Sequence, residues 1–182
     1  MGLQVFLEQK ENRLVDRWFS AVVDAYPTDT ARFLKREKDP FANPVGNITL
    51  KSLSSLFKAI VDGAGREVLV PVLDPILRIR AIQDFSPSQA TGFILLLKKI
   101  IAEDLKQILP DEAVADEAAD LNDRIDELLL MAFDIYFKCR EKIYELKANE
   151  VRNRTFMAFE RAGLVRDDPE AGECIEERHR LK

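Results

Sequence analysis

The sequence contains one histidine and two cysteines in 182 residues, which excludes most sites built on imidazole or thiolate groups. A haem globin needs a proximal histidine or a substitute ligand inside its helical core, and a di-iron bundle needs Glu-x-x-His on two helices. Zinc sites of the Cys/His type and histidine-dependent catalytic sets fail for the same reason, because His179 lies in a polar stretch near the end of the sequence. We therefore expect no cofactor, no metal site and no enzymatic activity.

The sequence also lacks an excess of basic residues and a long hydrophobic run. Lys and Arg number 27 against 32 for Asp and Glu, a net charge of −5, whereas a nucleic-acid-binding domain needs a basic face. The most apolar run, residues 93–101, contains Lys98 and Lys99 and falls far short of the roughly 20 residues that span a bilayer. The few cysteines and the absence of a signal-peptide pattern favour a reducing compartment. We expect no nucleic-acid partner, no membrane insertion and a cytoplasmic location.

What the sequence does contain is helical periodicity, without strand alternation. Hydrophobic residues make up 47% and charged residues 32%, values typical of one soluble globular domain. The spacing predicts an all-α bundle in which residues 1–163 form a single domain and residues 164–182 a polar tail. The predicted helices cover residues 3–25, 28–34, 48–61, 66–84, 87–109 and 110–163. Pro71 and Pro75 are expected to make the fourth short or kinked segments, and the last is either one long helix or two helices nearly end to end.

Three of the predicted helix starts have candidate capping residues. Thr28 or Asp29 follows a proline and can cap the second helix, and Asn43 or Asn47 can cap the third. Ser86, Pro87 and Gln89 match a capping box with proline at the first helical position.

The last predicted helix organises the chain, because apolar residues recur along it at steps of three and four. A second stripe beside this seam, formed by Leu129, Phe133, Tyr136 and Phe137, predicts that the middle of the helix is core. The seam itself consists of Val114, Ala118, Leu121, Ile125, Leu128, Ala132, Ile135 and Cys139.

Beyond Cys139 the apolar stripe narrows to Ile143, Leu146 and Val151. This part of the helix must lie on a surface, pair with a second copy of the chain, or dock on another protein. We expect a homodimer, and the predicted contact residues are Arg140, Ile143, Tyr144, Lys147 and Val151.

The segment EKDPFANPVGN, residues 37–47, predicts an ordered structural turn made by Asp39, Pro40, Phe41, Asn43 and Pro44. Two prolines restrict the backbone, and Phe41 between them is expected to bury its side chain as an apolar anchor. The alternative is a loop that presents Phe41 to a binding partner.

Two other groups of residues allow a functional interpretation beside a structural one. Cys139 lies on the seam and is expected to pack as a small buried residue, but neighbouring basic residues could lower its pKa and make it a redox sensor. Trp18, Phe19, Phe133 and Phe137 are expected to be core, although such a set could line a small-molecule pocket.

Two stretches, residues 26–46 (YPTDTARFLKREKDPFANPVG) and 126–151 (DELLLMAFDIYFKCREKIYELKANEV), and the spacing between them resemble the N-terminal domain of the RsbT co-antagonist proteins of the RsbRD type. The resemblance covers roughly residues 10–155, and the DPFANPVG turn is its most specific part. It implies a globin-like helical sensor domain without haem, which forms dimers and sends a long helix to a C-terminal STAS domain. The 31 residues after Val151 are too few for a STAS domain. We therefore expect a stand-alone, non-catalytic regulatory or sensor domain that acts through protein contacts. A small-molecule-binding bundle, or a redox-sensing domain that uses Cys139, is the alternative.

Overall fold

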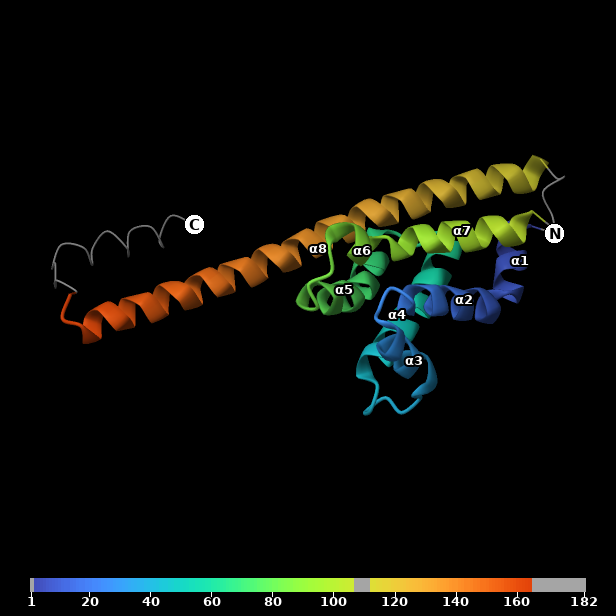
Figure 1. Ribbon diagram of the computed structural model, residues 1–182. Coiled ribbons are helices and arrows are strands. Elements are labelled where there is room, and N and C mark those ends of the chain that lie inside the picture. Colours follow the sequence, from blue (N-terminus) through green and yellow to red (C-terminus); the bar gives the residue numbers. More distant parts are fainter. Residues whose placement is uncertain (1, 107–111, 165–182) are drawn as a thin grey trace. The chain divides into compact units, whose positions relative to one another are not determined.

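The computed structural model describes residues 2–106 and 112–164, and all regular structure in these ranges is α-helical (Figure 1). The predicted all-α class is therefore confirmed. The helices are α1 (Leu3–Gln9), α2 (Glu11–Val23), α3 (Thr28–Arg36), α4 (Pro44–Val61), α5 (Arg66–Ile82), α6 (Pro87–Thr91), α7 (Phe93–Leu105) and α8 (Glu112–Arg161).

The chain divides into two compact units, residues 1–141 and residues 142–182. Unit 1 contains α1 to α7 and the N-terminal part of α8, and unit 2 contains the rest of α8. The predicted domain limits, residues 1–163 and 164–182, stay a prediction, and all but the first residue of the predicted tail lie outside the described ranges.

Trp18 on α2 is at the centre of unit 1. Its side chain is 0% exposed, its Nε1 donates to the carbonyl of Phe93 on α7 at 2.6 Å, and the two rings stack with centroids 6.0 Å apart. A fully buried indole needs a hydrogen-bond acceptor, and this one finds it across the helix interface. Since α2 packs on both α4 and α7, Trp18 and its buried neighbour Phe19 are core residues as predicted.

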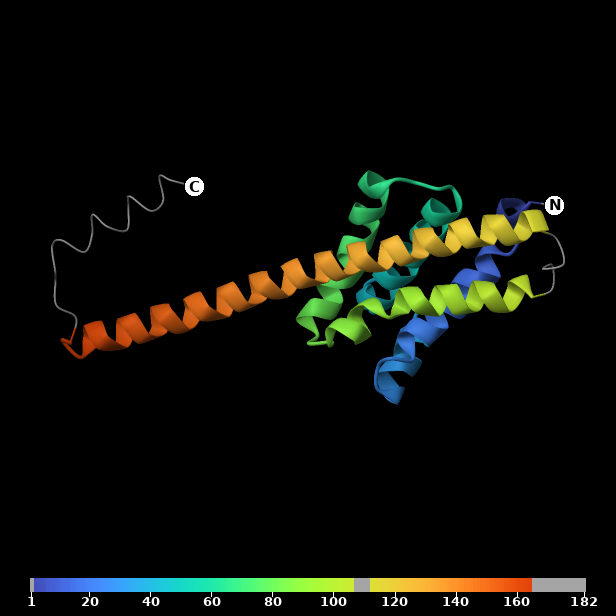
Figure 2. The same ribbon diagram turned by 90° about the horizontal axis from the view of Figure 1, so that it is seen from above.

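The N-terminal part of α8 lies antiparallel beside α7 (Figure 2). The seam predicted from Val114 to Ala132 is buried, so the three-and-four spacing identified the correct face. The second stripe was predicted wrongly: Tyr136 is buried, but Phe133 is 47% and Phe137 58% exposed. The surface that α8 packs on in unit 1 is narrower than the apolar face of the helix.

Several helix ends differ from the prediction. Lys10, with φ −105° and ψ 4°, divides the predicted first helix into α1 and α2. The residue before α3 is Pro27, so neither Thr28 nor Asp29 caps that helix. Gly92 separates the short α6 from α7, where one helix was expected. The capping box at Ser86 and Gln89 is present as predicted.

Helix α5 continues through Pro71 and Pro75 as one helix, so the expectation of short separate segments was wrong. Each proline removes one backbone donor and costs about 3 kcal/mol in a helix interior. The face that carries Leu73, Ile76 and Leu77 is fully buried against α4, and this burial offsets the loss.

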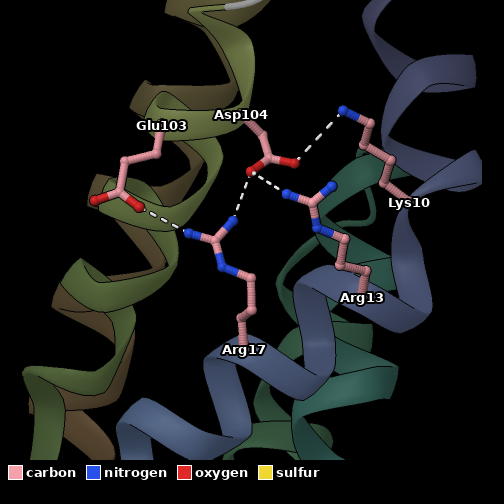
Figure 3. Close-up of polar contacts among 5 residues, drawn as sticks. All are labelled: Lys10, Arg13, Arg17, Glu103 and Asp104. Carbon is pink, nitrogen blue, oxygen red and sulfur yellow. Dashed lines mark hydrogen bonds and ion pairs between the residues drawn. The ribbon is translucent and has the colours of Figure 1, made fainter.

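A cluster of charges joins the α1–α2 corner to α7 (Figure 3). Asp104 of α7 is only 3% exposed; its Oδ1 accepts from Arg17 at 2.5 Å and from Arg13 at 3.5 Å, and Lys10 Nζ lies 3.5 Å from Oδ2. Arg17 also donates to Glu103 at 2.7 Å. A buried carboxylate needs such partners, and here one aspartate fixes where two helices meet a third.

Candidate functional site

Within residues 2–106 and 112–164, no three or more His, Cys, Asp or Glu side chains are placed to hold a metal ion. In the same ranges, no helix is long and apolar enough to cross a membrane. A surface hollow of about 340 Å³ lies where α1 meets α8, and two of its charged side chains bind backbone atoms. Glu117 accepts from the amide of Leu3 at 2.6 Å, and Arg124 donates to the carbonyl of Ile60 at 3.5 Å. These two side chains therefore join neighbouring helices of unit 1.

The α3–α4 turn presents Phe41 to solvent. The side chain is 96% exposed, so the prediction that Phe41 is a buried anchor was wrong. The anchor is Asn43, which is 3% exposed and donates from Nδ2 to the carbonyls of Leu34 and Glu37, both at 3.0 Å. Its Oδ1 accepts from the amide of Gly46 at 2.9 Å, which confirms Asn43 as the N-cap of α4. A polar side chain holds this turn because it satisfies three backbone groups that the turn leaves without partners.

Other contacts make the same turn rigid. Asp39 Oδ1 accepts from the amide of Phe41 at 3.0 Å, and its carbonyl accepts from the amide of Asn43 at 2.8 Å. Pro44 occupies the first turn of α4. A Cβ atom at Gly46 would lie 2.3 Å from Asn43 Nδ2, so only glycine allows this approach. The turn is thus a fixed support with an exposed aromatic ring at its tip.

In unit 2 every residue of α8 from Tyr144 to Arg161 is exposed, and one side of this helix is uncharged. Tyr144 is 57%, Val151 64% and Phe159 50% exposed, and Ala148 and Thr155 are exposed between them. Steps of three and four place these five residues on one side of a helix, with no charged residue in the sector that they span. We call these five residues the unit 2 face.

The residues predicted as partner contacts do not share one face. Tyr144 and Val151 belong to the unit 2 face, and Lys147 flanks it. Ile143 is half-buried and lies on another side of the helix. Arg140 belongs to unit 1, and its side chain is only 16% exposed because it contacts the α5–α6 turn. Arg140 thus contacts its own chain, and its role in a partner contact stays a prediction.

The sequence analysis missed the contacts between α8 and the α5–α6 turn. Arg140 Nη1 donates to the carbonyl of Ala81 at 2.8 Å and to Asp84 Oδ1 at 2.5 Å, and Tyr136 Oη donates to the carbonyl of Phe85. The amide of Phe85 donates to the carbonyl of Arg80 at 3.2 Å, which closes α5 in a Schellman motif. The sequence signal for this turn was Asp84, an aspartate at the position after α5 where glycine is usual.

Arg80 lies buried behind this turn. It is 2% exposed and donates to the carbonyls of Gln89 at 2.8 Å and Val22 at 3.4 Å. The guanidinium also faces the rings of Phe85 and Phe93, each at 5.1 Å. Burial lowers the pKa of Arg80, and the nearby Tyr26 opposes that shift. Carbonyl oxygens and ring faces thus replace water around the guanidinium.

The structure places Cys139 beside α5, half-buried, instead of fully buried in the core. Burial raises the pKa of its thiol; the carboxylate of Asp74 raises it further, and Arg78 lowers it. Arg78 Nε is itself bound to Asp74 at 2.6 Å. A redox sensor needs a thiolate near neutral pH, and this environment favours the neutral thiol.

Comparison with known proteins gives one family. The sequence model described as "RsbT co-antagonist protein rsbRD N-terminal domain" matches residues 12–151. An uncharacterised protein of Archaeoglobus fulgidus is 30% identical over 105 residues, which cover 54% of this chain and 66% of that protein. The chain thus spans just under two thirds of this relative's length. No solved structure matches the chain.

The first prediction compares two residues of the α3–α4 turn. Phe41→Ala should change the free energy of unfolding by less than about 0.5 kcal/mol, because the ring is exposed. Asn43→Ala, the matched variant, should lose about 2 to 3 kcal/mol through the missing cap and the two unsatisfied carbonyls. Urea unfolding followed by circular dichroism measures both values. A large loss for Phe41→Ala would contradict its exposure.

The second prediction concerns the thiol of Cys139, measured in a Cys174→Ser background. Because its pKa is raised, the thiolate should form at a higher pH than in a free cysteine, whose pKa is about 8.5. Alkylation by iodoacetamide at neutral pH should therefore be slower than for a free thiol, and its pH midpoint should be higher. The same protein unfolded in urea, the control, should return to the ordinary midpoint. A midpoint below the ordinary value would support redox sensing instead.

Proposed function

Because the chain belongs to the family of the RsbT co-antagonist protein rsbRD N-terminal domain, we propose that it is a non-catalytic regulatory domain that acts through protein contacts. The proposal includes a globin-like arrangement of its helices without haem, a homodimeric state and a sensor role in cytoplasmic signalling. The family match over residues 12–151 supports the regulatory role. The dimer rests on a separate observation, the exposed unit 2 face.

The unit 2 face supports the dimer through its length and composition. From Tyr144 to Phe159 it extends about 22 Å along the helix, at about 1.5 Å per residue. Isolated helices of this length are marginal in water, and most helical stability in proteins comes from packing an apolar face. Two copies of one uncharged face bury each other in a symmetric contact that needs no other partner.

Charged residues at both edges of the unit 2 face fit the same arrangement. Glu145 and Arg152 lie along one edge, and Lys147 and Arg154 along the other. Such edge charges stay in water and set partner choice and orientation, while the uncharged centre supplies the contact area. An uncharged centre with charged edges is also the arrangement found at protein–protein interfaces.

The third prediction tests the dimer with two variants. One places a negative charge on the unit 2 face, and the other places the same charge on the opposite side of the helix. Sedimentation velocity at tens of micromolar should give twice the 20.8 kDa mass of one chain. Val151→Glu should raise the dissociation constant at least about tenfold, because two carboxylates would be desolvated at the contact. Asn153→Glu, two residues away on the opposite side of the helix, should remain dimeric. A monomeric wild-type chain would contradict the proposed homodimer.

A second contact surface is proposed at Phe41, because its ring is 96% exposed on a rigid turn. A side chain on a backbone that is already fixed costs less entropy to immobilise on binding, and aromatic residues dominate many interfaces. Residues 36–39 beside it carry two positive and two negative charges, so the ring and not net charge supplies the contact. The partner that fits is a protein with an apolar pocket for this ring.

The fourth prediction concerns this second surface. In affinity purifications from extracts of the native host, quantified by mass spectrometry, Phe41→Ala should retain a direct partner at least about tenfold less than wild type does. Leu95→Ala, which removes a 47% exposed apolar side chain on α7, is the matched control and should retain it fully. Equal retention by Phe41→Ala and wild type would contradict the role of Phe41.

A further inference from the structure

Asp84 occupies a backbone position that normally belongs to glycine. It has φ 56°, in the left-handed region, and it is the one described non-glycine residue with positive φ. In the Schellman motif that ends α5, this is the position where a side chain costs most and glycine predominates. A strained residue persists where its surroundings hold it and where its side chain has a use.

The Asp84 side chain binds Arg140 on α8. Its Oδ1 accepts from Arg140 Nη1 at 2.5 Å, and the same nitrogen donates to the carbonyl of Ala81 at 2.8 Å. Tyr136, one helical turn earlier in α8, donates to the carbonyl of Phe85. Two successive turns of α8 therefore bind the short segment that follows α5.

The other side of the same segment contacts the core of unit 1. The Phe85 ring packs edge-on against Tyr26 at 5.1 Å and lies 5.1 Å from the buried guanidinium of Arg80. Tyr26 Oη donates to Gln83 Oε1 at 2.7 Å. The α5–α6 segment is thus held between the core and α8, and it links the C-terminal end of α5 to the start of α6 (Figure 1).

We propose that Asp84 and the carbonyls of Ala81 and Phe85, bound by Tyr136 and Arg140, form a latch that controls the dimer contact of unit 2. The latch binds α8 at residues 136 and 140, immediately before unit 2 begins at residue 142. With the latch closed, the start of the unit 2 helix is pre-organised for pairing; with the latch open, this helix end frays and the dimer weakens. A change in the packing of Arg80 or Phe85 would shift the α5–α6 segment and so alter its hydrogen bonds to Tyr136 and Arg140 on α8. The inference rests on the proposed homodimer and adds its regulation.

A latch made with a strained aspartate allows a variant that opens it without unfolding the protein. Asp84→Gly removes the carboxylate but relieves the left-handed backbone strain, so the melting temperature should stay the same or rise. Arg140→Gln is the second variant, because it removes the charge from the α8 side. Glu145→Gln is the matched control, since it breaks an exposed ion pair of unit 2, Lys142 Nζ to Glu145 Oε2 at 2.9 Å, outside the latch.

The experiment combines two measurements on these variants and the wild-type chain. Hydrogen exchange followed by mass spectrometry should show at least about fivefold faster exchange for the amides of residues 137–150 in Asp84→Gly and Arg140→Gln. Sedimentation equilibrium should show a dissociation constant raised at least about fivefold for both, because pre-organisation is lost. Glu145→Gln should match wild type in both measurements.

The outcomes separate the latch from the dimer. If both latch variants exchange and dimerise like wild type, the latch is overturned although the dimer stands. If the wild-type chain is monomeric, the dimer fails, and the latch then stands or falls on the exchange of residues 137–150 alone. If Asp84→Gly loses melting temperature and exchange rises throughout unit 1, Asp84 is a structural residue only and the latch is overturned.

Discussion

A buried positive charge without a carboxylate is the constraint on which the centre of unit 1 depends. Moving a guanidinium out of water costs several kcal/mol unless other groups replace the lost hydration. For Arg80 these groups are the carbonyls of Val22 and Gln89 and the rings of Phe85 and Phe93; within the described residues no ion pair involves it. They come from α2, α6, the α5–α6 segment and α7. The position of one side chain therefore fixes four neighbours, and the segment that contacts α8 is among them.

The sequence was sufficient for the features that follow from helix geometry. The buried seam from Val114 to Ala132 could be predicted because a helix repeats every 3.6 residues and one face must meet the core. The same periodicity does not say how wide the opposing surface is. Phe133 and Phe137 were therefore assigned to the core although half of each side chain is exposed. The exposed unit 2 face could be predicted only in part, because Arg140 was grouped with it by proximity in the sequence.

The features that escaped prediction depend on contacts between distant residues or on polar anchors. Asp104 meets Arg17 across 87 positions, and Asp84 meets Arg140 across 56. In a chain with 32% charged residues, spacing cannot select such pairs from many others. At the α3–α4 turn, hydrophobicity favoured Phe41 as the anchor, but Asn43 satisfies three backbone groups there. A polar side chain that is buried because it forms hydrogen bonds, such as Asn43, does not stand out in the hydrophobic pattern of a sequence.

Helix α5 carries Arg80 near its end and is also the helix interrupted by two prolines. Pro71 and Pro75 have no amide hydrogen, so the carbonyls of Glu67 and Pro71 receive no bond from the residue four positions ahead. Bending stiffness in a helix comes from these bonds, so α5 is softest around residues 67–75. The helix between Pro75 and its end at Ile82 is about 10 Å long, at about 1.5 Å per residue. A small change of angle at the prolines is thus converted into a displacement at Asp84, where α5 meets α8.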